Sequence, residues 1–138
     1  MNIVQISDKP AVVTVARRYE LQCAHRLTMV PPAHKCSQLH GHTYMVSVEL
    51  TGKIKAGTGW LIDFGAVDVA WGDLIHKTLD HKYLNEVEGL QNPTSELLAV
   101  WIARRLEVHF RGIAGVTLSA VEVAENHRSL ARYEIDCG

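Results

Sequence analysis

The sequence has few cysteines and lacks any pairing pattern among them, which excludes one broad class of protein. Its three cysteines are an odd number, and their spacing forms no disulfide framework of the kind that staples small secreted domains. The N-terminus carries neither a basic leader nor a hydrophobic stretch of signal length. From these absences we expect a protein of the reducing cytoplasm.

An excess of charge of one sign is missing as well. The chain has 14 basic and 15 acidic residues, which are interspersed and leave a net charge of −1. Such a chain has no electric field that would gather nucleic acid or an anionic membrane surface. We therefore expect a small molecule as the partner, and neither nucleic acid nor a membrane.

At 138 residues the chain has the size of one domain, and it contains no repeat, linker or low-complexity tract. Apolar residues alternate in two early stretches, recur at helical spacing in the middle and alternate again at the end, which predicts an α+β domain with the order β-β-α-α-β-β. Asp63 is expected to cap the first helix, and Pro93 to lie in the first turn of the second. The odd-numbered residues from Thr117 to Glu125 are expected to share one face of the third strand. The expected strands cover residues 13–25, 42–50, 116–125 and 130–137.

Three histidines near two strand ends form the strongest functional signal. His40 and His42 project from the same side of an extended segment, roughly 6.5 to 7 Å apart along the strand, a spacing that suits two ligands of one metal ion. His25 closes the preceding strand, and one loop joins the two strand ends. Imidazole nitrogen suits zinc, and three protein ligands leave a fourth position for water or substrate. The pattern predicts an open site for a divalent metal, with zinc as the first choice.

A closed structural zinc site, with Cys23 or Cys36 as a fourth ligand, is the alternative. Cys23 shares the parity of His25, but its alternating apolar neighbours favour a thiol in the core. Cys36 lies in a polar loop beside Lys35 and near the expected metal, conditions that favour a reactive thiolate. Four of the five remaining histidines are interpreted as structural or exposed residues: His34, His76, His109 and His127.

Two further features suit chemistry beside a metal. Asp80-His81 follows the first expected helix, and a carboxylate that orients an imidazole suits a proton shuttle near neutral pH. Taken alone, the dipeptide is interpreted more simply as a solvated turn. Glu125 ends an apolar strand, where its carboxylate could grip a planar guanidine-like edge through two parallel hydrogen bonds or could simply be exposed.

Five motifs follow one another between about Tyr19 and Tyr133. They are Cys36-Ser-Gln-Leu-His40-Gly-His42-Thr-Tyr44, Gly59-Trp-Leu-Ile-Asp63-Phe64, Leu79-Asp80-His81-Lys-Tyr-Leu84-Asn85, Asn92-Pro-Thr-Ser-Glu96, and Glu125 eight residues before Tyr133. Together they resemble the 6-pyruvoyl-tetrahydropterin synthase superfamily. The three-residue gap between Cys36 and His40 and the run from Asn92 to Glu96 resemble its bacterial 6-carboxy-5,6,7,8-tetrahydropterin synthases of queuosine biosynthesis. The biopterin branch usually has a longer gap.

The resemblance implies the tunnelling fold (T-fold), in which each subunit has a four-stranded antiparallel sheet and two helices. Strands of three subunits would join into a barrel, and two such rings would stack as a hexamer, a dimer of trimers. Pairing between subunits would also remove the open edges of a small sheet.

The resemblance also assigns roles to nine residues. Three histidines become zinc ligands, a cysteine with an aspartate and a histidine forms the proton-transfer group, and a glutamate anchors the pterin. Two residues at a helix start, where backbone donors are free, line the pocket or simply cap the helix. In this order, the residues are His25, His40 and His42; Cys36, Asp80 and His81; Glu125; Thr94 and Ser95.

The implied reaction is zinc-dependent and converts 7,8-dihydroneopterin triphosphate into 6-carboxy-5,6,7,8-tetrahydropterin, with loss of triphosphate and acetaldehyde and without a redox cofactor. Cys36 would abstract one side-chain proton, and His81 held by Asp80 would move a second. The alternatives are a 6-pyruvoyl-tetrahydropterin synthase, which stops after elimination of triphosphate, and a non-catalytic pterin- or zinc-binding protein. The joint presence of the thiol and the Asp-His pair argues against the last.

Two departures from the family pattern stand out. Asn126 occupies the position after the anchoring glutamate, where the family commonly has threonine, and this bears on substrate preference. Residues 1–16 extend beyond the shared pattern, and we expect this N-terminal extension of the single domain 1–138 to add nothing to the chemistry.

Overall fold

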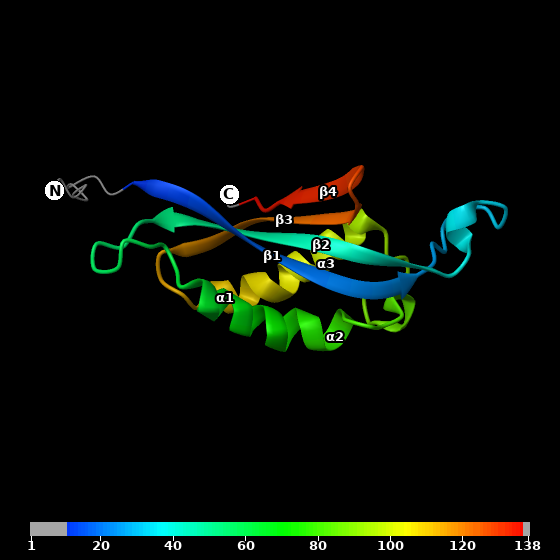
Figure 1. Cartoon of the computed structure of the whole chain (residues 1–138), viewed down its shortest axis with the longest axis horizontal. Coiled ribbons are helices and arrows are strands. Elements are labelled where there is room, and N and C mark those ends of the chain that lie inside the picture. Colours follow the sequence, from blue (N-terminus) through cyan, green and yellow to red (C-terminus); the bar gives the residue numbers. More distant parts are fainter. Residues whose placement is uncertain (1–10, 137–138) are drawn as a thin grey trace.

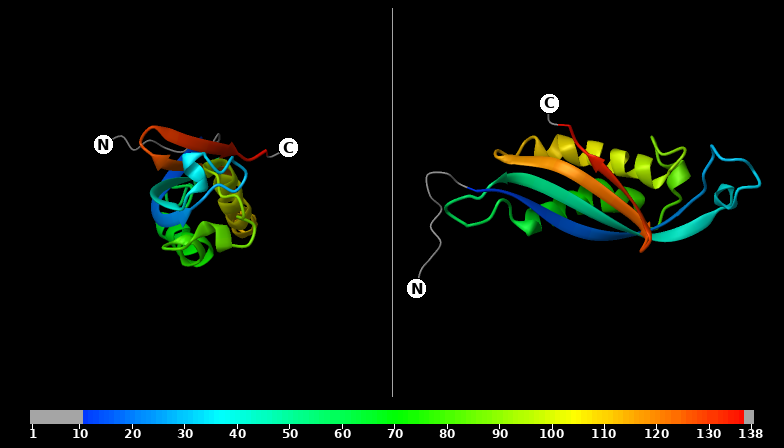
Figure 2. Two further views of the ribbon diagram at one scale, coloured as in Figure 1. Left: turned by 90° about the vertical axis from the view of Figure 1, so that its right-hand side faces the viewer. Right: turned by 90° about the horizontal axis from the view of Figure 1, so that it is seen from above.

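The computed structural model describes residues 11–136. Four strands form one antiparallel sheet in the order β1-β2-β3-β4. The helices lie against one face of this long, twisted sheet, as both Figure 1 and the views in Figure 2 show. The predicted order of strands and helices is confirmed. The strands are β1 Val12–His25, β2 His40–Lys53, β3 Val116–Asn126 and β4 Ser129–Glu134.

The first helical segment begins where the sequence predicts. The side chain of Asp63 accepts the N–H of Gly65 and caps α1 (Phe64–Trp71). The chain continues through a π-helical turn, Gly72–His76, into α2 (Lys77–Leu79), so one helical path runs along the sheet.

The second long helix, α3, covers Ser95–Phe110. Thr94 is its cap, because the Thr94 hydroxyl accepts the N–H of Leu97 at 3.1 Å. The expectation that Pro93 lies in the first turn was wrong, since it precedes the cap. Its carbonyl is thereby left outside the helix and reaches a histidine, as described below.

One hydrophobic core lies between the sheet and the helices. Every second residue of β2 points toward the helices, as the alternation in the sequence predicts, and the apolar stripe of α3 packs against it. This packing fixes where the two strand ends and the helix start meet. The fully buried side chains include Tyr44, Val46, Val48 and Leu50 of β2 and Leu98, Ile102 and Leu106 of α3.

β3 changes face at a bulge, which the sequence did not reveal. Ser119 is an extra residue opposite the step from Glu49 to Leu50 of β2. The prediction that Thr117 and Ser119 share a face with Glu125 was therefore wrong: Thr117 is exposed and Ser119 half-buried. The shift turns the odd-numbered residues after the bulge toward the helices, and with them Glu125. The buried residues of this strand are Val116 and Leu118 before the bulge and Ala120, Val121 and Val123 after it.

The ends of the chain limit two expectations. Residues 1–10 of the expected extension and Cys137 lie outside the described residues, whereas β1 already begins at Val12.

None of the helices within residues 11–136 combines the length and the apolar character needed to cross a membrane.

Candidate metal centre and pocket

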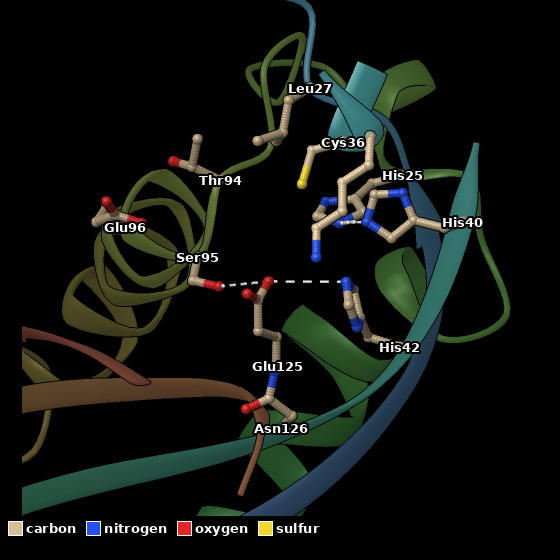
Figure 3. Close-up of a pocket in the computed structure, with 11 residues that line it drawn as sticks. His25, Leu27, Cys36, His40, His42, Thr94, Ser95, Glu96, Glu125 and Asn126 are labelled. Atoms are coloured by element: carbon tan, nitrogen blue, oxygen red, sulfur yellow. Dashed lines mark hydrogen bonds and ion pairs between the residues drawn. The ribbon is translucent and has the colours of Figure 1, made fainter. Parts of the chain in front are cut away.

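Strand pairing brings the three histidines together. His25, the last residue of β1, lies opposite His40, the first residue of β2, and His42 follows one pleat further along β2. Their ligand nitrogens all lie within 4.8 Å of one another. Figure 3 shows the three rings converging at one wall of a pocket. Within residues 11–136 they form a cluster that could hold a metal ion.

Backbone carbonyls fix which nitrogen of two rings faces the centre. Nδ1 of His25 lies 2.8 Å from the carbonyl oxygen of Pro93, and Nδ1 of His40 lies 2.7 Å from that of Gln38. A carbonyl only accepts, so each Nδ1 donates its hydrogen, and each neutral ring presents a bare Nε2. The two Nε2 atoms are 3.0 Å apart. Nitrogens bound tetrahedrally to zinc at about 2.0–2.1 Å lie about 3.3 Å apart, so the donor set fits this ion.

The surroundings of His25 and His42 favour the neutral ring, which is the form that binds a metal. Burial lowers the pKa of His25 and of His42 from the usual value of histidine. His25 is only 2% exposed, and the hydroxyl of the buried Tyr44 lies 3.1 Å from its Nδ1. A ring that resists protonation stays available to a cation at neutral pH.

The histidines open onto a cavity of about 540 Å³. Its walls come from the loop after β1, from the start of α3 and from the end of β3 (Figure 3). Most residues predicted for the site meet here, and so does Asn126, which was expected to bear on substrate preference. Lys35 and Glu96 were not expected as lining and only adjoin expected residues in sequence. Leu27 carries no signal in the sequence at all. Besides the histidines, the lining residues are Leu27, Lys35, Cys36, Thr94, Ser95, Glu96, Glu125 and Asn126.

The two described thiols differ sharply. Cys36 lies in a short 3-10 turn, Lys35–Ser37, is half-buried, and directs its sulfur into the cavity (Figure 3). Cys23 is buried and donates its S–H to the carbonyl of Leu79 at 3.2 Å, and burial raises its pKa to about 12. Neither sulfur belongs to the metal-ligand cluster. Cys23 therefore acts as a core thiol, and Cys36 faces the cavity.

Glu125 faces the histidines from β3, the strand next to β2 in the sheet. Its carboxylate accepts the hydroxyl of Ser95 at 3.3 Å, and the same oxygen lies 3.7 Å from Nε2 of His42. Thr94 contributes its hydroxyl to the helix cap. The first turn of α3 also offers backbone N–H groups that have no partner within the helix. This side of the cavity thus presents the carboxylate of Glu125 next to a set of donors.

The structure does not bring Asp80 and His81 into this cavity. They follow α2 and are tied to β1, where Asp80 accepts the N–H of Gln22 at 2.9 Å. His81 donates Nδ1–H to Asp80 at 2.7 Å, although its side chain is 76% exposed. Burial alone would raise the pKa of Asp80, but the hydrogen bonds from Gln22 and His81 outweigh it and lower that pKa. The pair is thus an oriented imidazole beside an ionised carboxylate.

The backbone at His81 adds to this picture. Its φ is +58°, the one positive value among the non-glycine residues described. Backbone in this region is costly for a residue with a side chain and is often found at functional positions. His81 borders a neighbouring depression, which is also lined by His42 and Thr43.

Comparison with known proteins agrees with the resemblance of the motifs. Residues 14–136 match the family model of 6-pyruvoyl tetrahydropterin synthase. A 6-carboxy-5,6,7,8-tetrahydropterin synthase of Synechocystis is 37% identical over 125 residues, which cover 86% of this chain and 91% of the relative. A 6-pyruvoyl tetrahydrobiopterin synthase of Drosophila melanogaster is 32% identical over 141 residues, which cover 93% and 82%.

The fold agrees as well. The structure of Caenorhabditis elegans 6-pyruvoyl tetrahydropterin synthase superposes with a TM-score of 0.82 at 24% identity, covering 92% of this chain and 98% of the other. The expected T-fold subunit is thereby confirmed. Since the family model spans nearly all of the described residues, the chain belongs to the 6-pyruvoyl tetrahydropterin synthase family.

Proposed function

We propose that this protein is a zinc-dependent lyase that converts 7,8-dihydroneopterin triphosphate and water into 6-carboxy-5,6,7,8-tetrahydropterin, triphosphate and acetaldehyde. The observation that carries the proposal is one cavity in which three histidines, the thiol of Cys36 and the carboxylate of Glu125 face one another. The Synechocystis relative, named for this product, supports the choice of reaction. So does the short gap between Cys36 and His40, which indicates the queuosine branch.

His25, His40 and His42 would hold the metal ion, and zinc is proposed because a set of three imidazole nitrogens suits it. When bound, zinc would polarise the oxygens of the substrate side chain and make adjacent groups more acidic. The carbonyls of Pro93 and Gln38 would keep two of these rings oriented throughout.

Glu125 would anchor the pterin. The amidine-like edge of the pterin ring carries two parallel N–H donors, which match a carboxylate as an arginine side chain does. The hydroxyl of Ser95 already holds one oxygen of this carboxylate at 3.3 Å and would fix its orientation. With the ring anchored there, the three-carbon side chain of the substrate would extend toward Cys36 and the histidines.

Proton transfer would fall to Cys36 and to the Asp80-His81 pair. Cys36, as a thiolate, would abstract a proton from the substrate side chain inside its own cavity. His81, oriented by Asp80, is exposed and lies outside that cavity, so it would serve the cavity of a neighbouring copy. Unsaturation would then move from the ring to the side chain, with no external oxidant or reductant.

This arrangement requires a homo-oligomer, and the family resemblance indicates a hexamer built as a dimer of trimers. β1 and β4 are the edges of the four-stranded sheet, and pairing them between copies would cover their open backbone groups. A thiol that must stay reduced and a phosphorylated substrate fit an enzyme of the cytoplasm.

The second candidate is the 6-pyruvoyl-tetrahydropterin synthase reaction, which the Drosophila relative's name supports. It would use the same cavity but stop after loss of triphosphate. The products separate the two, because only the first reaction releases acetaldehyde and removes two carbons from the pterin. Mass analysis of the pterin formed from 7,8-dihydroneopterin triphosphate is therefore the deciding experiment.

A further inference from the structure

His34 lies on the surface of the loop after β1, yet its ring contacts the residue that is proposed to carry the chemistry. Nδ1 of His34 accepts the backbone N–H of Cys36 at 3.0 Å. His34 has extended backbone angles, φ −69° and ψ 134°, and occupies the cap position of the turn Lys35–Ser37. Asn, Asp or Ser usually fills such a position with a side-chain oxygen. Here a ring nitrogen does the same.

This contact is one of two that hold the backbone of Cys36. The carbonyl of Cys36 accepts the N–H of Leu27 at 2.7 Å, which ties the turn to the end of β1. The hydroxyl of Ser37 closes the turn on the carbonyl of Pro32 at 2.8 Å. Backbone bonds from Ser37 to His34 and from Gln38 to Lys35 also close the turn. Among the side chains in these contacts, only that of His34 binds Cys36 itself.

We infer that His34 is a positioning residue for Cys36, acting through this hydrogen bond in the tautomer that leaves Nδ1 bare. The inference rests on the proposed role of Cys36 in proton transfer. Loss of the acceptor lets the turn relax and spreads the positions of the sulfur, so proton abstraction slows. Metal and pterin binding persist, because His34 neither belongs to the histidine cluster nor lines the cavity.

Four variants of the full-length, zinc-loaded protein test this. His34→Ala removes the acceptor, and His34→Phe keeps a ring without one. His34→Asn restores an acceptor, because an asparagine oxygen reaches the N–H two residues on. Ser37→Ala is the matched control, since it loosens the same turn without touching the N–H of Cys36.

We expect His34→Ala and His34→Phe to lower kcat about five- to tenfold, the factor that one hydrogen bond is worth, and His34→Asn to recover it to within about twofold. KM and zinc content should stay unchanged in all of them, and Ser37→Ala should lose less than His34→Ala. The inference is overturned if His34→Ala keeps full kcat, or if His34→Asn is as slow as His34→Phe.

A spectroscopic measurement separates this inference from the proposed function. In protein labelled with 15N-histidine, the Nδ1 of His34 should show the shift of an unprotonated acceptor, whether or not the protein turns over a pterin. A hydrogen on Nδ1 would overturn the inference. Wild-type protein that consumes no substrate would count against the proposed function alone, and the nitrogen shift would still decide on the contact.

Discussion

His25 and His40 face each other across the β1–β2 pair with 3.0 Å between their Nε2 atoms, while each Nδ1 lies against a main-chain carbonyl. In neutral rings held this way, both Nε2 atoms direct lone pairs toward one point. Converging lone pairs are a donor set for a cation, and His42 adds a third nitrogen within 4.8 Å. The thiol of Cys36 does not belong to this cluster. The metal ligands and the thiol can therefore be removed by separate substitutions.

The metal content should depend on these rings. Purified protein should carry about one zinc per chain, and His40→Ala or His42→Ala should lose most of it, because two histidines hold the ion poorly. The fold should survive, since both residues are only partly buried. Elemental analysis beside circular dichroism checks this, with the exposed His127→Ala as the control. Zinc that stays near one per chain in both variants would rule out the three-histidine site.

Low pH should lower the free energy of unfolding of the metal-free protein through His25 and His42. Burial lowers the pKa of His25 and His42 in the folded state, whereas unfolded histidine titrates at about 6.5. As the pH falls through about 6.5, the unfolded chain takes up protons that the folded chain refuses, so the free energy of unfolding decreases.

Urea unfolding of metal-free protein between about pH 7.5 and pH 5.5 measures this slope. His25→Gln, which removes the buried ring, should flatten it. A slope that does not change in this variant would show that His25 is not the titrating group.

Substitutions of Cys36 and of Glu125 should separate the chemical step from pterin binding. Cys36→Ala should keep its zinc and still bind a pterin while turnover drops about 10²- to 10⁴-fold, the usual contribution of a general base. Glu125→Ala should instead weaken pterin binding about ten- to a hundredfold through lost charged hydrogen bonds. Calorimetry with a non-reactive pterin measures pterin binding in both variants. Loss of zinc from Cys36→Ala would favour the closed structural site.

Copies of the chain should share their catalytic groups. Since His81 lies outside the cavity that holds Cys36, each proposed site takes the thiol from one copy and the imidazole from another. Cys36→Ala and His81→Ala should each be nearly inactive, but co-expression should restore part of the activity by forming some intact sites. Mixed oligomers no more active than either parent would place both groups within one copy.

Local patterns made much of the fold and the histidine cluster predictable. Alternation placed His40 and His42 on one face, and the caps at Asp63 and Thr94 were readable because a cap joins residues only two or three apart. The motifs then identified the family. These features depend on neighbours in sequence, which a single chain displays directly.

Features that depend on contacts between residues far apart in the chain could not be predicted from the sequence. The bulge at Ser119 follows from how β3 fits against β2, and an alternating apolar pattern is compatible with either face. The position of Asp80 and His81 depends on their attachment to Gln22 of β1. His34 was interpreted as merely structural or exposed, because its role needs one rotamer of one ring.

The reaction itself tests the account most directly. Zinc-loaded protein incubated with 7,8-dihydroneopterin triphosphate, without nicotinamide or flavin, should release one triphosphate and one acetaldehyde per pterin and leave 6-carboxy-5,6,7,8-tetrahydropterin. Mass spectrometry of the pterin, with an enzymatic assay of acetaldehyde, measures this. A pterin that still carries three side-chain carbons after losing triphosphate would contradict the proposed reaction and assign the pyruvoyl product, and unconsumed substrate would contradict catalysis altogether.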